Sequence, residues 1–320
     1  MLHFGRRPGG YGPRAPGALR ECSRILPPVL VAGLALLTPA AAAPQPSSGA
    51  PKKHGGVPTF AVGVQNVNLD VLVTRGGRPI AGLSANDFIV TDNGVRQEVE
   101  VVAREDTAVD AILALDTSAS VSGKRLVALQ SAAHAFVDAL WPTDSITLIG
   151  FATSLRLAAS QGVPRAETHI AIDEFRGSGS TSMIDAIYAS LLTSDPRRGR
   201  PLVLVFSDGR EGGSWLTPES VRAVVRATDA VIDYVAVGDE PRSFLEAVAE
   251  DTGGRGWTAR SDRDLREAFV AALEDFKSRY RLRYEPRGVL LPGWHALSVK
   301  LDGAKGEVRA RRGYLAGTGR

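Results

Sequence analysis

Three oxygen-bearing side chains stand at alternate positions after a short apolar run. The run from Val109 to Leu115 leads directly into Asp116, Ser118 and Ser120. Side chains two residues apart in an extended segment point to the same side, so one carboxylate and two hydroxyls can meet at one point. Oxygen ligands of this kind suit a hard cation such as Mg²⁺. The segment therefore predicts one part of a cation site.

Two later loops offer further oxygen ligands. Thr181 follows the flexible run 177–180 (Gly-Ser-Gly-Ser), and Asp208 follows the apolar run 202–206 much as Asp116 follows its own run. In a doubly wound parallel sheet these two strands are neighbours, and ligands bind in the crevice between their carboxyl ends. The hydroxyl of the adjacent Ser180 is the alternative metal ligand to that of Thr181 in this loop. The predicted metal ligands are Asp116, Ser118, Ser120, Thr181 and Asp208.

The charge of this ligand set indicates a use for the metal. Two aspartates only neutralise a divalent ion, and hydroxyls add no further charge, so the metal stays attractive to another anion. A carboxylate from a partner protein would complete the coordination. We therefore expect Mg²⁺, with Mn²⁺ or Ca²⁺ as alternatives, and a protein partner that offers an acidic side chain.

The elements that must position these loops alternate between strands and helices. Alternation of this kind predicts an α/β fold with a doubly wound, mainly parallel, six-stranded sheet and helices on both faces. Strands are expected at 109–115, 145–151, 155–158 (an antiparallel edge), 202–206, 231–237 and about 256–258. Helices are expected at about 124–140, 167–175, 182–192, 217–229, 242–251 and 262–278.

Segments of β character flank this α/β region. Residues 59–106 show alternating apolar positions with hairpin turns at Gly76-Gly77 and Asn93-Gly94, and residues 279–320 return to strands. Neither segment could form a stable core by itself. We expect the two to pair as a small, sandwich-like β subdomain beside a metal-binding domain at 107–278.

The first 43 residues resemble a secretory signal peptide. They combine an arginine-rich start, an apolar stretch at 29–37 and small residues for cleavage. Residues 44–58 have the composition of a flexible linker. We expect a secreted, periplasmic or cell-envelope protein. An uncleaved anchor is the alternative, and membrane contact is expected only in that case.

Removal of the leader changes the charge and cysteine content. The chain carries a net charge of +3, and residues 1–43, with five Arg and one Glu, contribute +4, which leaves the mature chain near −1. The basic pI therefore gives no argument for nucleic-acid binding. The single cysteine, Cys22, also lies in the leader, so the mature chain has no disulfide and no thiolate nucleophile.

Other chemistries lack support in the sequence. No Gly-x-Ser-x-Gly elbow accompanies the histidines, which are expected to be surface or packing residues, and the 177–181 loop lacks the lysine of a phosphate-binding loop. Most tryptophans are expected to anchor the core or an interface. The arginines at 197–200 are expected to lie in a solvent-exposed loop. We expect no enzyme activity. The histidines after the leader are His54, His134, His169 and His295, and the tryptophans are Trp141, Trp215, Trp257 and Trp294.

The three loops resemble the metal-ion-dependent adhesion site of von Willebrand factor type A (vWA) domains. The matching motifs are Asp116-x-Ser118-x-Ser120, Gly179-Ser180-Thr181 and Phe206-Ser207-Asp208-Gly209. The resemblance implies a Rossmann-like fold over about 107–278 and a binding or adhesion role. It also implies that the two serines and the threonine contact the metal directly or through water, and that the aspartates often act through water.

The flanking segments resemble those of a bacterial exported vWA subgroup. The similarity lies in 71–74, 83–88 and 92–94 before the domain and in 312–314 after it. The leading hypothesis is thus a metal-dependent protein-binding or adhesion module. The alternatives are a structural component of an envelope assembly whose metal only stabilises it, and an accessory subunit without activity of its own.

Overall fold

The computed structural model describes residues 66–103, 107–290 and 292–317. The predicted signal peptide and linker lie outside these residues. Within the described part of the chain, no helix combines the length and apolar character needed to cross a membrane.

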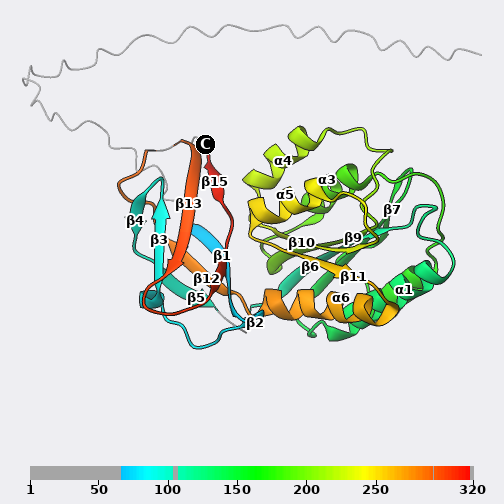
Figure 1. The fold of residues 1–320 in the computed structure, drawn as a ribbon, viewed down its shortest axis with the longest axis horizontal. Coiled ribbons are helices and arrows are strands. Elements are labelled where there is room, and N and C mark those ends of the chain that lie inside the picture. The colour runs from blue at the N-terminus through cyan, green and yellow to red at the C-terminus, as the bar shows by residue number, and fades with distance from the viewer. Residues whose placement is uncertain (1–65, 104–106, 291, 318–320) are drawn as a thin grey trace, which may run out of the picture. The chain divides into compact units, whose positions relative to one another are not determined.

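A six-stranded sheet forms the centre of the α/β unit (Figure 1), in the order β11-β10-β9-β6-β7-β8. The strand β6 pairs in parallel with β9, so that Leu115 lies opposite Phe206 and the two predicted acids follow neighbouring strands. Only β8, at the edge, is antiparallel. The strands are β6 (Val109–Asp116), β7 (Ser145–Phe151), β8 (Leu155–Ala159), β9 (Arg200–Ser207), β10 (Val231–Val237) and β11 (Gly256–Ala259).

Helices cover both faces of the sheet because β6 sends alternate apolar side chains to opposite sides. Leu113 and Leu115 pack with the helices α1, α2 and α6, whereas Ile112 and Ala114 pack with α3, α4 and α5. The predicted fold class is confirmed. The helices are α1 (Lys124–Ala139), α2 (Arg165–Asp173), α3 (Met183–Thr193), α4 (Pro218–Ala227), α5 (Ser243–Thr252) and α6 (Asp262–Lys277).

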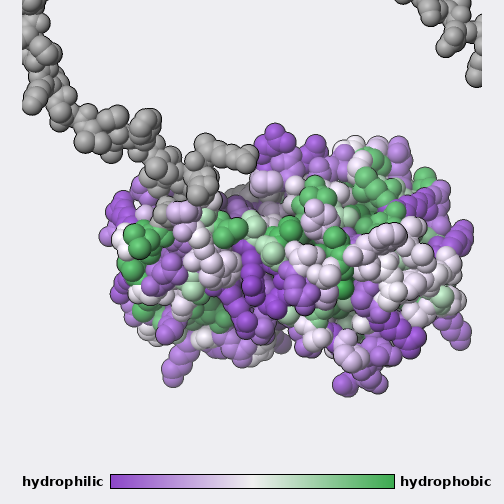
Figure 2. Space-filling view, turned by 90° about the horizontal axis from the view of Figure 1, so that it is seen from above, coloured by the Kyte–Doolittle hydropathy of each residue, from purple (hydrophilic) through white to green (hydrophobic). Residues whose placement is uncertain are grey.

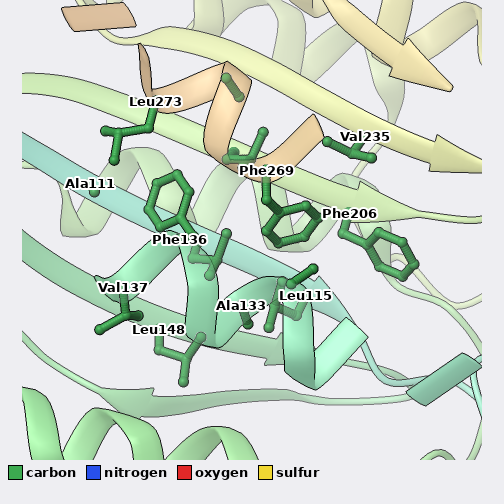
Figure 3. Close-up of a cluster of buried hydrophobic side chains, with 14 of the residues drawn as sticks. Ala111, Leu115, Ala133, Phe136, Val137, Leu148, Phe206, Val235, Phe269 and Leu273 are labelled. Atoms are coloured by element: carbon green, nitrogen blue, oxygen red, sulfur yellow. The ribbon is translucent and has the colours of Figure 1, made fainter. Parts of the chain in front are cut away.

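Aromatic side chains fill the core beneath α1 and α6. Phe136 of α1 and Phe269 of α6 point toward each other above the sheet (Figure 3), with perpendicular rings whose centroids are 6.5 Å apart. Phe269 also contacts Phe206 of β9, at 6.1 Å between centroids. Such edge-to-face contacts add to the stabilisation from apolar burial. They anchor α1, which follows the loop carrying Ser118 and Ser120, against the sheet.

The flanking segments form the β subdomain, built from β1–β5 and β12–β15. Its two sheets have the orders β14-β1-β12-β5, with β2 beside β1, and β15-β13-β3-β4. Each sheet pairs strands from both ends of the chain, for example β1 with β12 and β3 with β13. The strands are β1 (Val67–Arg75), β2 (Arg78–Pro79), β3 (Phe88–Asp92), β4 (Val95–Gln97), β5 (Glu100–Ala103), β12 (Tyr280–Tyr284), β13 (Gly293–Leu301), β14 (Glu307–Arg309) and β15 (Gly313–Ala316). A short 3₁₀ helix, η1 (Ala85–Asp87), precedes β3.

The two predicted hairpin turns are present in the β subdomain. Gly76 and Gly77 connect β1 to β2, and Asn93 and Gly94 connect β3 to β4, all four with positive φ. Two consecutive residues with positive φ are the geometry that a two-residue hairpin turn of matching twist requires.

Buried ionic contacts join the β subdomain to the α/β unit. Arg200 at the start of β9 is only 1% exposed, and its Nε donates to the Oδ1 of Asp70 in β1 at 2.7 Å. The expectation that the arginines at 197–200 form a solvated loop is therefore wrong for Arg200, although Arg197 and Arg198 are exposed. Arg200 can be buried because Asp70 in β1, which lies 130 residues earlier in the chain, compensates the charge of its guanidinium group.

A second buried pair lies nearby. Arg279, which is fully buried, places its Nη2 3.9 Å from the Oδ1 of Asp233 in β10, and its Nη1 donates to the carbonyl of Gly253 at 2.8 Å. Burial raises the pKa of Asp233 to about 6, against the opposing effect of the Arg279 charge. Asp233 therefore binds a proton more readily in the folded chain than in the unfolded one.

The pKa of Asp233 predicts a pH dependence of stability. Because the folded-state pKa lies above the unfolded value of 3.8, protonation of Asp233 favours folding, and this contribution is lost as the pH rises through about 6. Between about pH 4 and pH 7, the free energy of unfolding of the natural chain should fall by about 2–3 kcal/mol relative to that of Asp233→Asn. Urea unfolding across this range measures both, and parallel pH profiles would contradict the assignment.

The surface is mixed in character. On the face that Figure 2 shows, hydrophobic residues form separate patches between hydrophilic ones.

Candidate metal site at the carboxyl ends of β6 and β9

Asp116 is the fixed centre of the candidate site. Its side chain is completely buried at the end of β6. Its Oδ1 accepts a hydrogen bond from the backbone nitrogen of Ser118 at 2.9 Å, and its Oδ2 accepts one from the Oγ of Ser207 at 2.9 Å. The carboxylate thus connects the loop after β6 to the end of β9, as the neighbouring strands require.

The two predicted serines lie together. The Oγ atoms of Ser118 and Ser120 are 3.0 Å apart, and Ser118 is buried. The loop is held at its start by Thr117, whose backbone nitrogen donates to the carbonyl of Phe151 at 2.7 Å. The alternate spacing in the sequence therefore brings both hydroxyls to one side of the loop.

The loop carrying Thr181 is tied to the first loop by its backbone. The nitrogen of Ser178 donates to the carbonyl of Thr117 at 2.9 Å, and the nitrogen of Ala119 donates to the carbonyl of Gly179 at 3.0 Å. Gly179 has a φ of 79°, and a Cβ at this position would come within 2.4 Å of the Oγ1 of Thr153. Only glycine fits this close approach without displacing the loop.

Burial distinguishes the two competing hydroxyls of this loop. Thr181 is 5% exposed, like the buried Asp116 and Ser118, whereas Ser180 is exposed to solvent. The carbonyl of Thr181 also accepts from the nitrogens of Gly212 and Gly213, at 3.1 and 2.8 Å. These bonds join the second loop to the loop that follows Asp208.

Asp208 is buried but borders two cations. Its Oδ2 lies 3.8 Å from Nη1 of Arg125 and 3.9 Å from Nε of Arg210, and both arginines are partly exposed. Arg125 also donates to the carbonyl of Ser120 at 3.0 Å. The structure thus brings the three loops together, with Asp116, Ser118 and Ser120 in direct contact and Thr181 and Asp208 linked to them through backbone and arginine contacts. Their role as metal ligands stays a prediction.

The buried carboxylates fit a divalent cation. Burial raises the pKa of Asp116, the nearby charge of Asp208 raises it further, and the hydrogen bonds from Ser118 and Ser207 oppose the rise. The buried Asp116 carboxylate is costly when ionised, and a divalent cation beside it would compensate that cost. The donors are all oxygen, as Mg²⁺ prefers. Among the described residues, no group of three or more His, Cys, Asp or Glu side chains is arranged so that all of them could hold one metal ion, so this site depends on its hydroxyls.

Several residues near the site were not expected from the sequence. Ser207 orients Asp116, and Arg125 and Arg210 place positive charge beside Asp208. Ser207 belongs to the third motif, whereas Arg125 and Arg210 lie close to the motifs in the sequence; their proximity to the motifs was the only signal available for the two arginines. The carboxylate of Glu211 accepts from the nitrogen of Ile184 at 3.1 Å and from that of Ser214 at 2.9 Å, which ties the 209–217 loop to the start of α3.

Three of the four tryptophans lie outside the core, which leaves the interface role as the open part of the expectation. Trp215, on the 209–217 loop, is 93% exposed, and Trp141 and Trp294 are each 42% exposed. The carboxylate of Asp185 holds the Trp215 backbone, accepting from its nitrogen at 2.9 Å. A fixed backbone with an exposed indole is a feature of binding surfaces.

Comparisons with known proteins identify the family and several relatives. The family model of the von Willebrand factor type A domain matches residues 110–275. A UPF0353 protein of Mycolicibacterium vanbaalenii is 25% identical over 60% of this chain and 67% of its own. A UPF0353 protein of Mycolicibacterium gilvum is 23% identical over 73% of this chain and 74% of its own.

Solved structures with a similar fold include two bacterial proteins. A von Willebrand factor type A protein from Catenulispora acidiphila is 14% identical, with a TM-score of 0.49 over 77% of this chain and 76% of that one. The conserved hypothetical protein BatB from Bacteroides thetaiotaomicron is 15% identical, with a TM-score of 0.46 over 53% of this chain and 98% of that one.

Proposed function

Because the chain belongs to the von Willebrand factor type A domain family, whose members are often metal-dependent adhesion or protein-interaction modules, we propose that it binds a partner protein through a divalent cation. Domains of this family are generally interaction modules and not enzymes. The resemblance seen in the three sequence motifs is thereby confirmed at the level of the family.

The observation that carries the proposal is the buried Asp116 carboxylate at the junction of the three loops. Ser118, Ser120 and Thr181 would hold the metal through their hydroxyls, and Asp116 and Asp208 would hold it directly or through water. The bound Mg²⁺ would supply a Lewis-acidic position for one more oxygen ligand. Because the set contains two carboxylates, a metal bound there would keep its affinity for the carboxylate of a partner.

The surroundings of the site support an acidic partner. Arg125 and Arg210 are partly exposed beside Asp208 and would attract an approaching carboxylate. Trp215 offers a large apolar surface on the same loop that leaves Asp208. Buried tryptophans and arginines contribute strongly at protein interfaces, so these residues are expected to line the contact with the partner.

We place the protein outside the cytoplasm, in the envelope or the medium. The support is the signal-like leader at 1–43. The competing proposal is a structural envelope component in which the metal only adds stability.

A metal-dependent capture experiment separates the two proposals. The immobilised protein is incubated with an envelope extract of the source organism, either with Mg²⁺ or with a chelator, and captured proteins are identified. A partner retained only with Mg²⁺, and lost when its own acidic residue is replaced by the amide, supports the adhesion role. A large rise in melting temperature with Mg²⁺ but no metal-dependent partner would favour the structural role.

A further inference from the structure

The helices α1 and α2 carry matching His-x-x-x-Asp pairs that contact each other crosswise. The Nε2 of His134 in α1 lies 2.9 Å from the Oδ1 of Asp173 in α2. In return, the Nε2 of His169 in α2 lies 3.3 Å from the Oδ1 of Asp138 in α1. Each aspartate therefore contacts the Nε2 atom, here called the outer nitrogen, of the histidine on the opposite helix. Both histidine rings are thus oriented by a carboxylate.

The inner ring nitrogens of the two histidines face each other. Their Nδ1 atoms are 2.7 Å apart, with ring centroids at 4.9 Å and planes inclined by 22°. A neutral histidine that donates from Nε2 to a carboxylate presents a lone pair at Nδ1. Two lone pairs directed at one point repel each other unless a positive charge lies between them. That charge can be a shared proton or a metal ion.

We propose that His134 and His169 form a second metal site, for an imidazole-preferring transition metal such as Zn²⁺. Carboxylates bound to the outer nitrogens of two histidines are the usual surroundings of metal-bound imidazoles, because they fix the tautomer and raise the basicity of the ligand. The negative charges of Asp138 and Asp173 would offset that of the ion. Because both histidines are partly exposed, water can occupy the coordination positions that the two protein ligands leave open.

The geometry requires only a small adjustment. Two nitrogens bound to one tetrahedral Zn²⁺ at about 2.0 Å are separated by roughly 3.3 Å, so the rings would part by about 0.6 Å. The side chains of His134 and His169 are 29% and 30% exposed and have room to rotate. A cavity of about 340 Å³ beside His134, lined also by Gln130 and Ser131, provides space for the water ligands.

The proposed site is chemically distinct from the oxygen site at the end of β6. It offers nitrogen ligands, which suit Zn²⁺, whereas carboxylates and hydroxyls suit Mg²⁺. It joins α1 to α2, and α1 begins at Lys124, four residues after Ser120. A bound ion would therefore fasten the helix that leads away from the oxygen site. The proposal does not depend on the function assigned to that oxygen site.

Calorimetric titration of the full chain with Zn²⁺ tests the proposal. Because Zn²⁺ also accepts oxygen ligands, the titration is run in an excess of Mg²⁺. We expect one saturable Zn²⁺ site. It should be lost in His134→Asn and in His169→Asn, and its affinity should fall by about 10- to 100-fold in Asp138→Asn and Asp173→Asn, where only the outer partner of a histidine changes.

Two controls separate this site from other effects. Ser118→Ala should retain the Zn²⁺ site, because it alters only the oxygen site. Glu267→Gln removes a carboxylate on α6 that pairs with Arg263 and should leave Zn²⁺ binding unchanged. Circular dichroism confirms that each variant is folded. Absence of saturable Zn²⁺ binding would overturn the proposal, and so would unchanged affinity in folded histidine variants.

Discussion

Replacing Ser118 with alanine should abolish saturable Mg²⁺ binding while the chain stays folded. The Oγ of Ser118 lies 3.0 Å from that of Ser120 and is buried beside the Asp116 carboxylate. Loss of a residue that only hydrogen-bonds to a metal ligand typically weakens metal binding by about 10- to 100-fold. Loss of a direct ligand should therefore weaken Mg²⁺ binding by more than about 100-fold. The lost hydroxyl contact should cost only about 1 kcal/mol of stability. Calorimetric titration with Mg²⁺ and thermal unfolding measure the two effects.

Matched variants on the same loops make this test specific. Ser122→Ala removes an exposed hydroxyl two residues beyond Ser120 and should leave Mg²⁺ affinity unchanged. On the second loop, Thr181→Ala should weaken Mg²⁺ binding strongly, whereas Ser180→Ala, at an exposed position, should have little effect. Equal Mg²⁺ affinity in the natural chain, Ser118→Ala and Thr181→Ala would refute the proposed ligand set.

Replacing Asp70 with alanine should destabilise the protein by about 3–5 kcal/mol, because it leaves Arg200 buried without its counter-charge. Arg200 is 1% exposed and donates to the Asp70 carboxylate at 2.7 Å. The neighbouring Arg279 is fully buried and would lose a compensating charge as well. Urea unfolding of the natural chain and of Asp70→Ala gives the difference in the free energy of unfolding.

Two comparisons identify the unpaired charge as the cause. The double variant Asp70→Leu with Arg200→Met replaces the pair by apolar side chains and should recover much of the lost stability. Glu267→Ala breaks the exposed pair between Arg263 and Glu267, and its effect should stay below about 1 kcal/mol. If Asp70→Ala were no more destabilising than Glu267→Ala, the ionic contact would not hold the β subdomain to the α/β unit.

Local sequence patterns were sufficient for the fold class and the three site loops. Apolar runs that end in Asp116 and Asp208 predict buried parallel strands, and neighbouring strands place their carboxyl ends together. Thr217 and Ser261, residue types that favour helix starts, stand just before α4 and α6 and accept hydrogen bonds from the backbone nitrogens of Ser220 and Asp264. These features were readable because each depends on residues close together in the chain or on a repeating period.

The sequence by itself therefore determined the alternation of elements, the hairpin turns and the oxygen-bearing motifs. Only the tertiary structure decided that Arg200 is buried against Asp70 and that His134 meets His169. Those contacts join residues 130 and 35 positions apart, and no local period relates their side chains. Whether a charged or titratable side chain is solvated or buried depends on what packs against it, and that partner is set by strand pairing and helix packing.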